Sequence, residues 1–247
     1  MLPVLNIGPL AIQLPGLFLI GGVWVGSIMA ERAAERHDVP PDAITNLIFY
    51  SLLAGLIGAR LGYALQFLSI YLERPLGLFS LNPSTLSLPE GMLAGGLLAL
   101  IYGQRRRLRL WSALDALAPG LAAFSIALGF SHLASGDFFG MQTTLPWRIS
   151  LFGAERHPTQ VYEILLAGLT LMAVLWASRQ RSIPGFTFLL WMALASGSYL
   201  LISGFRGDSV VIFGMVRQGQ LVSLALLLLA MVAVHFRARA EISAEKG

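Results

Sequence analysis

Long apolar segments alternate with short polar loops along the whole chain. Seven such segments can be delimited, at residues 10–30, 46–70, 88–103, 111–133, 160–178, 185–205 and 217–236. About 20 helical residues cross the hydrocarbon core of a bilayer. The third segment is short and is interrupted by Gly95 and Gly96, and the fourth contains Asp115 and Pro119. The pattern predicts an all-α polytopic membrane protein with about seven transmembrane helices.

The amino-acid composition favours the same class. Apolar residues make up 56% of the 247 residues and charged residues 12%, about half the ~25% that an average soluble domain carries. So few charges cannot cover the surface of a soluble fold, and so many apolar residues exclude disorder. Tandem repeats and low-complexity tracts are missing from the sequence, so we expect residues 1–247 to form a single transmembrane domain.

The net charge of +4 does not indicate nucleic-acid binding, because the basic residues cluster in short loops. The chain contains no cysteine, which excludes disulfides, thiolate metal ligands and a thiol nucleophile of its own. We expect neither a metal nor a cofactor. The first basic residue is Arg32, so the amino terminus lacks the basic region of a cleavable signal peptide and the first apolar segment should be retained.

Basic residues in the loops predict the orientation, because cytoplasmic loops carry an excess of Lys and Arg. With the amino terminus outside, eleven fall in cytoplasmic segments: Arg32, Arg36, Arg105, Arg106, Arg107, Arg109, Arg179, Arg181, Arg237, Arg239 and Lys246. Five fall in outer segments: Arg74, Arg148, Arg156, Arg206 and Arg217. We therefore expect the amino terminus outside and the carboxyl terminus in the cytoplasm.

Arg60 lies deep in the second apolar segment, within Gly58-Ala59-Arg60-Leu61-Gly62-Tyr63. A charge at the bilayer centre costs at least about 2.5–3.5 kcal/mol on insertion scales, so it usually has a partner and a function. The spacing of Gly58 and Gly62 allows close approach of another helix. The guanidinium either forms an internal ion pair that holds helices together or binds an anion with its five donors.

The segment Arg156-His157-Pro158-Thr159-Gln160-Val161-Tyr162-Glu163 contains a second group of polar residues. Pro158 suits the first turn of a helix, and Gln160 and Glu163 share one helix face. A helix amino terminus attracts anions, and His157 lies at this end. The alternative is a capped helix start in which Glu163 bonds to a neighbour.

Other polar residues lie near the ends of the apolar segments. Arg206 ends the sixth segment, as an interfacial anchor or as a site cation. His132 and Asp137 lie near the outer end of the fourth segment. Asp115 lies about one turn from the opposite end of that helix, too far to meet Glu163, so we expect it to cap structure or to pair with loop arginines.

The candidate site residues reach the outer half of the bilayer from four different segments: Arg60, His132, His157, Gln160, Glu163 and Arg206. Cations, a carboxylate and imidazoles open to the hydrocarbon suit the phosphate of a phospholipid. A transporter or an intramembrane serine protease is less well supported. For a protease, Ser196 and Ser198 lack a matching histidine in a neighbouring helix.

At these residues the chain resembles the prolipoprotein diacylglyceryl transferase family, whose members lipidate lipoprotein precursors. Four stretches occur in the family's order: 58–63, 115–119, 156–163, and Gly219-Gln220 followed by Ser223. The similarity extends from about residue 7 to residue 236 with the same seven-span layout. It implies a multi-pass protein of the bacterial plasma membrane, with an anionic phospholipid and a lipoprotein precursor as partners.

The family transfers the diacylglyceryl group of phosphatidylglycerol to the thiol of a lipobox cysteine and releases glycerol phosphate. The resemblance implies that Arg60 and Arg206 neutralise the leaving phosphate. Electrostatic stabilisation of this kind usually makes the largest single contribution to the rate enhancement of an enzyme. Gln160 and Glu163 would orient the headgroup, and Tyr63 would bond near it. The acceptor cysteine belongs to the substrate, consistent with a chain that has none.

Several family positions are replaced. The His-Gly-Gly of the third helix reads Ala94-Gly95-Gly96, and residues 129–137 have glycine where the family's arginine is expected. An arginine and a glutamate that precede Arg206 in the family align with Tyr199 and Ser203, and a tyrosine of the first helix aligns with Pro15.

These replacements leave two hypotheses. The chain is either a divergent diacylglyceryl transferase, with His132, His157 or Glu163 in catalytic roles, or a non-catalytic relative that serves as a lipid-binding membrane subunit or scaffold. Groups that hold an anionic headgroup are retained, whereas the missing ones matter mainly when charge develops in the transition state. We therefore expect lipid binding to be intact and transfer to be very weak, unless His132 or His157 acts as the base.

The loop charges generate a test of orientation. Cysteines introduced at Gln104 and at Gln142 of this cysteine-free chain should react with a membrane-impermeant maleimide from opposite sides of the membrane, because the two loops are separated by one predicted span. Labelling of both positions from one side would overturn the predicted topology.

Overall fold

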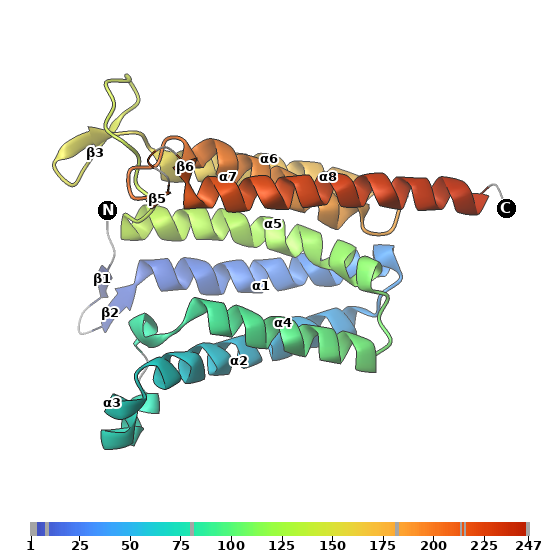
Figure 1. The fold of residues 1–247 in the computed structure, drawn as a ribbon, viewed down its shortest axis with the longest axis horizontal. Helices are drawn as coiled ribbons and strands as arrows, with labels where there is room; N and C mark the ends of the chain where they lie inside the picture. Colours follow the sequence, from blue (N-terminus) through green and yellow to red (C-terminus); the bar gives the residue numbers. More distant parts are fainter. Residues whose placement is uncertain are drawn as a thin grey trace. The chain divides into compact units, whose positions relative to one another are not determined.

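The structure is a computed structural model that describes residues 4–7, 10–79, 82–180, 183–212, 214 and 216–245. It is built from α-helices (Figure 1): α1 (Leu14–Ala34), α2 (Pro41–Gln66), α3 (Leu68–Glu73), α4 (Leu88–Arg105), α5 (Leu110–Ser135), α6 (Thr159–Ala177), α7 (Phe186–Ser203) and α8 (Gln218–Glu245). Short antiparallel hairpins lie between or before them: β1 (Val4–Ile7) with β2 (Leu10–Gln13), β3 (Ile149–Leu151) with β4 (Ala154–Arg156), and β5 (Val211–Ile212) with β6 (Val216–Arg217). The predicted all-α class is confirmed.

Each predicted apolar segment contains one long helix. Among the described residues, six helical segments are long and apolar enough to cross a membrane, and α4 is not one of them. The chain is therefore a multi-pass membrane protein, while the count of seven spans and the orientation stay predictions. Arg181 and Lys246, which entered the loop count, lie outside the described residues.

The described chain forms two compact units, Met1–Asp38 with Trp111–Gly247, and Val39–Leu110. In the second unit, α4 packs closely on α2 through small residues. A Cβ atom on Gly91 would lie 2.9 Å from the carbonyl oxygen of Gly55, and one on Gly95 would lie 2.8 Å from that of Ser51. The close approach predicted from Gly58 and Gly62 occurs on this face, whereas the expectation of a single domain stays a prediction.

In the first unit, α1 meets α5 at a glycine pair. A Cβ atom on Gly26 would lie 2.8 Å from the carbonyl oxygen of Gly120, so the two backbones touch here. On the other side of α5, Ala118 and Ala122 form a buried core with Val174 of α6. Helices α7 and α8 pack along each other. Small residues on α5 thus let the helices of this unit approach closely.

Asp115 of α5 caps the amino terminus of α7. Its carboxylate is 1% exposed and accepts hydrogen bonds from the backbone N–H of Gly185, at 2.5 Å, and of Phe188, at 2.9 Å. A negative charge also interacts favourably with the helix dipole at this end. The expectation that Asp115 caps structure is confirmed.

The glycine contact between α1 and α5 predicts a position-specific loss of stability. Gly26→Ala should destabilise the fold by about 1–3 kcal/mol, because backbone has to move to admit the methyl group. Unfolding followed by tryptophan fluorescence should show a lower Tm, by about 2–4 °C for each kcal/mol.

Gly21→Ala in the same helix is the matched control, because a Cβ atom on Gly21 would have no neighbouring atom within 4 Å. Alanine favours helix by about 1 kcal/mol over glycine, so this variant should be as stable as the wild type or more so. Equal Tm values for the two variants would contradict the close contact.

Candidate functional site

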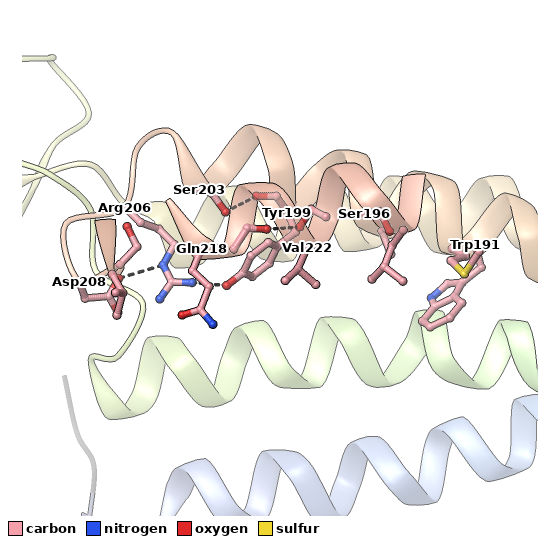
Figure 2. Close-up of a pocket in the computed structure, with 15 residues that line it drawn as sticks. Trp191, Ser196, Tyr199, Ser203, Arg206, Asp208, Gln218 and Val222 are labelled. Atoms are coloured by element: carbon pink, nitrogen blue, oxygen red, sulfur yellow. Dashed lines mark hydrogen bonds and ion pairs between the residues drawn. The ribbon is translucent and has the colours of Figure 1, made fainter. Parts of the chain in front are cut away.

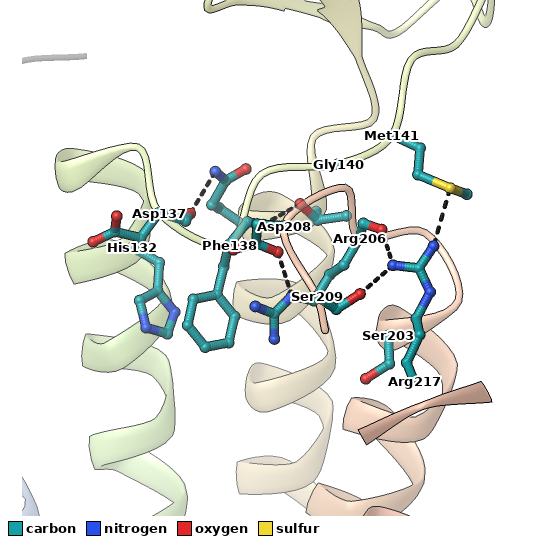
Figure 3. A network of polar contacts seen from close by, with 12 residues as sticks. His132, Asp137, Phe138, Gly140, Met141, Ser203, Arg206, Asp208, Ser209 and Arg217 are labelled. Carbon is teal, nitrogen blue, oxygen red and sulfur yellow. Dashed lines mark hydrogen bonds and ion pairs between the residues drawn. The ribbon is translucent and has the colours of Figure 1, made fainter. Parts of the chain in front are cut away.

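The site is organised by residues 137–143, which we call the central loop (Figure 3). Its backbone bonds to the turn after α7, where Met141 donates to the Phe205 carbonyl at 2.7 Å and Gly207 donates to the Phe139 carbonyl at 2.8 Å. On its other side, the His157 N–H donates to the Met141 carbonyl at 3.0 Å. The central loop therefore joins the turn after α7 to the start of α6.

The segment at the start of α6 holds the central loop in place. The Thr159 hydroxyl donates to the Phe138 carbonyl at 2.5 Å, and the Gln160 amide donates to the Asp137 carbonyl at 2.8 Å. Gln160 is fully buried, and its Oε1 has no hydrogen-bond partner among the described residues. The amide nitrogen of Gln160 thus holds the central loop by a hydrogen bond. The predicted contact of Gln160 with a headgroup stays a prediction.

His132 of α5 and Glu163 of α6 form a partly buried hydrogen-bonded pair. The Nδ1 atom of His132 donates to Glu163 Oε2 at 2.8 Å, with 12% and 18% of the two side chains exposed. Gly129 admits α6 this closely, since a Cβ atom there would lie 2.8 Å from Ile164 Cγ1. A carboxylate on Nδ1 fixes the neutral imidazole as the tautomer with its lone pair on Nε2. This is the geometry of an oriented base.

Phe138 lies between this pair and Arg206 (Figure 3). The His132 and Phe138 rings stack with their centroids 3.8 Å apart and an interplanar angle of 10°. The Arg206 guanidinium carbon lies 3.6 Å from the Phe138 centroid. Phe138 has φ 58°, a left-handed conformation that costs a non-glycine residue about 1–2 kcal/mol. Such strain is kept where surrounding contacts over-determine it.

Arg206 is buried and does not extend its guanidinium group to the membrane–water interface as an interfacial anchor would. It is 7% exposed, its Nε donates to Asp208 Oδ1 at 2.9 Å, and its Nη1 donates to the Tyr199 hydroxyl at 2.6 Å. Arg217 donates to the Arg206 carbonyl and to the Ser209 hydroxyl. This group of residues therefore contains two guanidinium groups and one carboxylate, and the carboxylate of Asp208 pairs with Arg206.

A groove of about 730 Å³ opens between α7 and α8 beside Arg206 (Figure 2). Its lining residues are Trp191, Met192, Ala195, Ser196, Tyr199, Ser203, Arg206, Asp208, Ser209, Val210, Gln218, Gly219, Val222, Ser223 and Leu226. A smaller cavity of about 160 Å³ is lined by Glu163 and shares Ala195 and Tyr199 with the groove. Tyr199 thus lines both the groove and the cavity next to Glu163.

The remaining predicted site residues have other surroundings. His157 packs on Phe205, with ring centroids 5.2 Å apart, and its Nδ1 lies 3.5 Å from the Tyr162 hydroxyl. Asp137 is exposed at the start of the central loop. The structure therefore brings together His132, Glu163 and Arg206, and it gives His157 a separate aromatic neighbourhood.

Arg60 and Tyr63 belong to the unit of residues 39–110. Arg60 donates from Nε to the Leu78 carbonyl at 2.8 Å and from Nη1 to the Thr85 carbonyl at 3.0 Å. Its Nη2 donates to the Gly77 carbonyl. Backbone carbonyls and the Thr85 hydroxyl, rather than a carboxylate, are therefore its partners within this unit. The predicted approach of Arg60 to Glu163 and the lipid-binding roles of Arg60 and Tyr63 stay predictions.

Sequence reasoning missed two contributions to the site. Phe138 was not singled out, because an apolar residue after Gly136-Asp137 gives no sign of a left-handed backbone. Tyr199 was considered only as a replaced family position, although its spacing of seven residues from Arg206, two helical turns, could have indicated the contact.

Together, the apolar helices, the partly buried His–Glu pair, the arginine cluster and the groove define a multi-pass membrane protein with a polar site inside its helices. The model of the prolipoprotein diacylglyceryl transferase family matches residues 3–236, and the chain belongs to this family.

Curated relatives carry the name phosphatidylglycerol–prolipoprotein diacylglyceryl transferase. The protein of Bordetella parapertussis is 32% identical over 208 residues, which are 80% of this chain and 79% of the relative. That of Methylococcus capsulatus is 30% identical over 240 residues, 92% and 91% of the two chains. That of Synechococcus elongatus is 27% identical over 237 residues, 90% and 82% of the two chains. The predicted family resemblance is confirmed.

The backbone of Phe138 generates a stability prediction. Both Phe138→Gly and Phe138→Ala delete the ring, but only glycine adopts φ 58° without strain. Phe138→Gly should therefore be the more stable of the two by about 1 kcal/mol, measured as the difference in Tm.

Phe130 provides the comparison, because it lies in the α5 helix. There the order should reverse, with alanine more stable than glycine by about 1 kcal/mol. The same order at both positions would show that the left-handed conformation of Phe138 is not maintained in solution.

Proposed function

We propose that this protein transfers the diacylglyceryl group of phosphatidylglycerol to the thiol of a lipobox cysteine in a lipoprotein precursor, in the plasma membrane of a bacterium. The names of the relatives support the reaction and both substrates. The observation that carries the proposal is the hydrogen bond of 2.8 Å between His132 and Glu163, because the third-helix position of the family's histidine is occupied here by Ala94.

His132 is the general base in this proposal. The thiol proton passes to its Nε2, the thiolate sulfur bonds to the glyceryl carbon, and the bond between that carbon and the phosphate oxygen breaks. Glycerol phosphate leaves with the electron pair, and the product is a thioether. Glu163 stabilises the imidazolium that forms, as the carboxylate of a catalytic triad does.

Arg206 neutralises the phosphate as it leaves. Asp208 and Tyr199 use two of its five donors, and Arg217 adds a second cation close by. We assign further headgroup contacts to Arg60, to Tyr63 and to the unpartnered Oε1 of Gln160, and we assign His157 to the mouth of the site. Hydrogen-bond donors held in place around a developing negative charge usually make the largest single contribution to the rate enhancement of an enzyme.

The replaced positions lower the expected rate. Tyr199 and Ser203 stand where the family has an arginine and a glutamate, so one cation is missing from the site. Losing one charged contact in the transition state costs about 10²–10³-fold in rate. Transfer should therefore be much slower than in relatives that keep these residues.

The second candidate is a non-catalytic, lipid-binding membrane subunit or scaffold. The pairing of Arg206 with Asp208 at 2.9 Å favours it, because a neutralised cation stabilises a departing phosphate less. The two functions differ in one respect that can be measured: both bind phosphatidylglycerol, and only the first makes the thioether.

We expect purified protein, given phosphatidylglycerol and a lipobox peptide, to form a slow thioether product detectable by mass spectrometry. His132→Ala should lower its rate by about 10²–10⁴-fold, because a general base contributes that much. Glu163→Gln should also lower it and should shift the pH profile, because the imidazolium loses its carboxylate.

His157→Ala is the matched control and should change the rate by only a few fold, since its ring packs on Phe205. A rate unchanged in His132→Ala but abolished in His157→Ala would move the base to His157. Bound phosphatidylglycerol without any product in the wild type would establish the non-catalytic candidate instead.

A further inference from the structure

We infer that the groove between α7 and α8 holds one acyl chain of an anionic phospholipid and that Trp191 limits the length of that chain. This inference deepens the proposed function by assigning the site for the tail of the donor lipid. It starts from the distribution of polar and apolar residues along the groove (Figure 2).

The groove is charged at one end and mostly apolar along its length. Arg206, Asp208 and Gln218 line the end next to the central loop. Farther along, the wall consists mainly of apolar side chains, such as Met192 and Val222, and the small hydroxyls of Ser196 and Ser223 are its polar groups there. An amphiphile with a polar head and a single hydrocarbon tail has the same distribution.

The charge at the polar end selects an anion. Arg206 lines this end in direct contact with the carboxylate of Asp208. Arg217 does not line the groove, but it donates to the Arg206 carbonyl and so adds a second cation behind this end. Ser209, which also lines the groove, accepts a hydrogen bond from Arg217. A phosphate headgroup would complement the excess positive charge, whereas a zwitterionic headgroup would also bring its own cation close to both arginines.

The length of the groove matches one leaflet. Its lining on α7 extends from Trp191 to Ser203, which at 1.5 Å per residue is about 18 Å. Half of the hydrocarbon core is about 15 Å thick. A phospholipid whose phosphate lies at Arg206 therefore has room for one extended tail in this groove.

Trp191 closes the far end. Its ring lies at the end of the groove opposite Arg206 (Figure 2), and it packs on the buried core of Ala118, Ala122 and Val174. An acyl chain longer than the groove has to bend away from the Trp191 ring, so the methylenes beyond the length of the groove remain outside it. Burial of one methylene changes affinity about fourfold, which is enough to select among tail lengths.

The test compares binding of dimyristoyl- and distearoyl-phosphatidylglycerol by native mass spectrometry, without acceptor peptide. Trp191→Ala should raise the ratio of distearoyl to dimyristoyl binding by about tenfold or more, since contact with only two further methylenes corresponds to about sixteenfold. Val222→Trp should weaken binding of both lipids by narrowing the groove. Val222 is 54% exposed, so the larger side chain has space and the variant should fold even if Trp191→Ala does not.

Trp176→Ala is the matched control, because Trp176 is 64% exposed on α6 and does not line the groove. It should leave the ratio and the affinity unchanged. An unchanged ratio in Trp191→Ala together with unchanged affinity in Val222→Trp would overturn the inference. A protein that binds with the expected selectivity and forms no thioether would refute the proposed transfer alone, and one that forms thioether without this selectivity would refute the acyl site alone.

Discussion

The contact on which the site depends is the stack of Phe138 between His132 and Arg206. Phe138 belongs to the central loop, His132 to the end of α5 and Arg206 to the turn after α7. Both His132 and Arg206 pack on the Phe138 ring. The stack is maintained against the backbone conformation of Phe138, so its neighbours supply the compensating energy. The hydrogen bonds of Thr159 and Gln160 to the carbonyls of residues 137 and 138 provide part of it.

Much of the fold could be predicted from the sequence, because bilayer thickness and hydrophobic patterning constrain helix position strongly. The predicted ends of the long helices lie within five residues of the observed ends, except that α8 continues to Glu245 instead of ending at residue 236. The depth of Asp115 in α5 allowed a capping role or pairing with loop arginines, and the structure shows the cap. The start of α2 at Pro41 was missed, since the polar first turn of a membrane helix carries no hydropathy signal. The status of α4 as a span depends on a composition near the limit for crossing a bilayer.

The candidate site was only partly predictable. Residue types and helix ends indicated His132, Glu163 and Arg206, but not that Glu163 pairs with His132. That pairing depends on how closely α6 approaches Gly129, which is a property of packing between helices and not of either segment alone. For residues 156–163 the sequence allowed an anion site or a helix start in which Glu163 bonds to a neighbour. The structure shows the bond of Glu163 to His132, and it shows Thr159 and Gln160 bonded to the central loop. A polar residue in an apolar segment indicates that its side chain needs a hydrogen-bond partner, but the sequence does not identify that partner.

Tyr199 and Ser203 lie one helical turn apart, at positions for which the family resemblance implies an arginine and a glutamate. Ser203 is 1% exposed, and its hydroxyl donates to the Tyr199 carbonyl at 2.6 Å. A glutamate introduced alone at position 203 would bury a carboxylate, and an arginine introduced alone at position 199 would place a second guanidinium beside Arg206. Either single change leaves an uncompensated charge inside the fold, which costs several kcal/mol. A charge pair can therefore be built at these two positions only by making both substitutions together, because each one alone yields a destabilised protein.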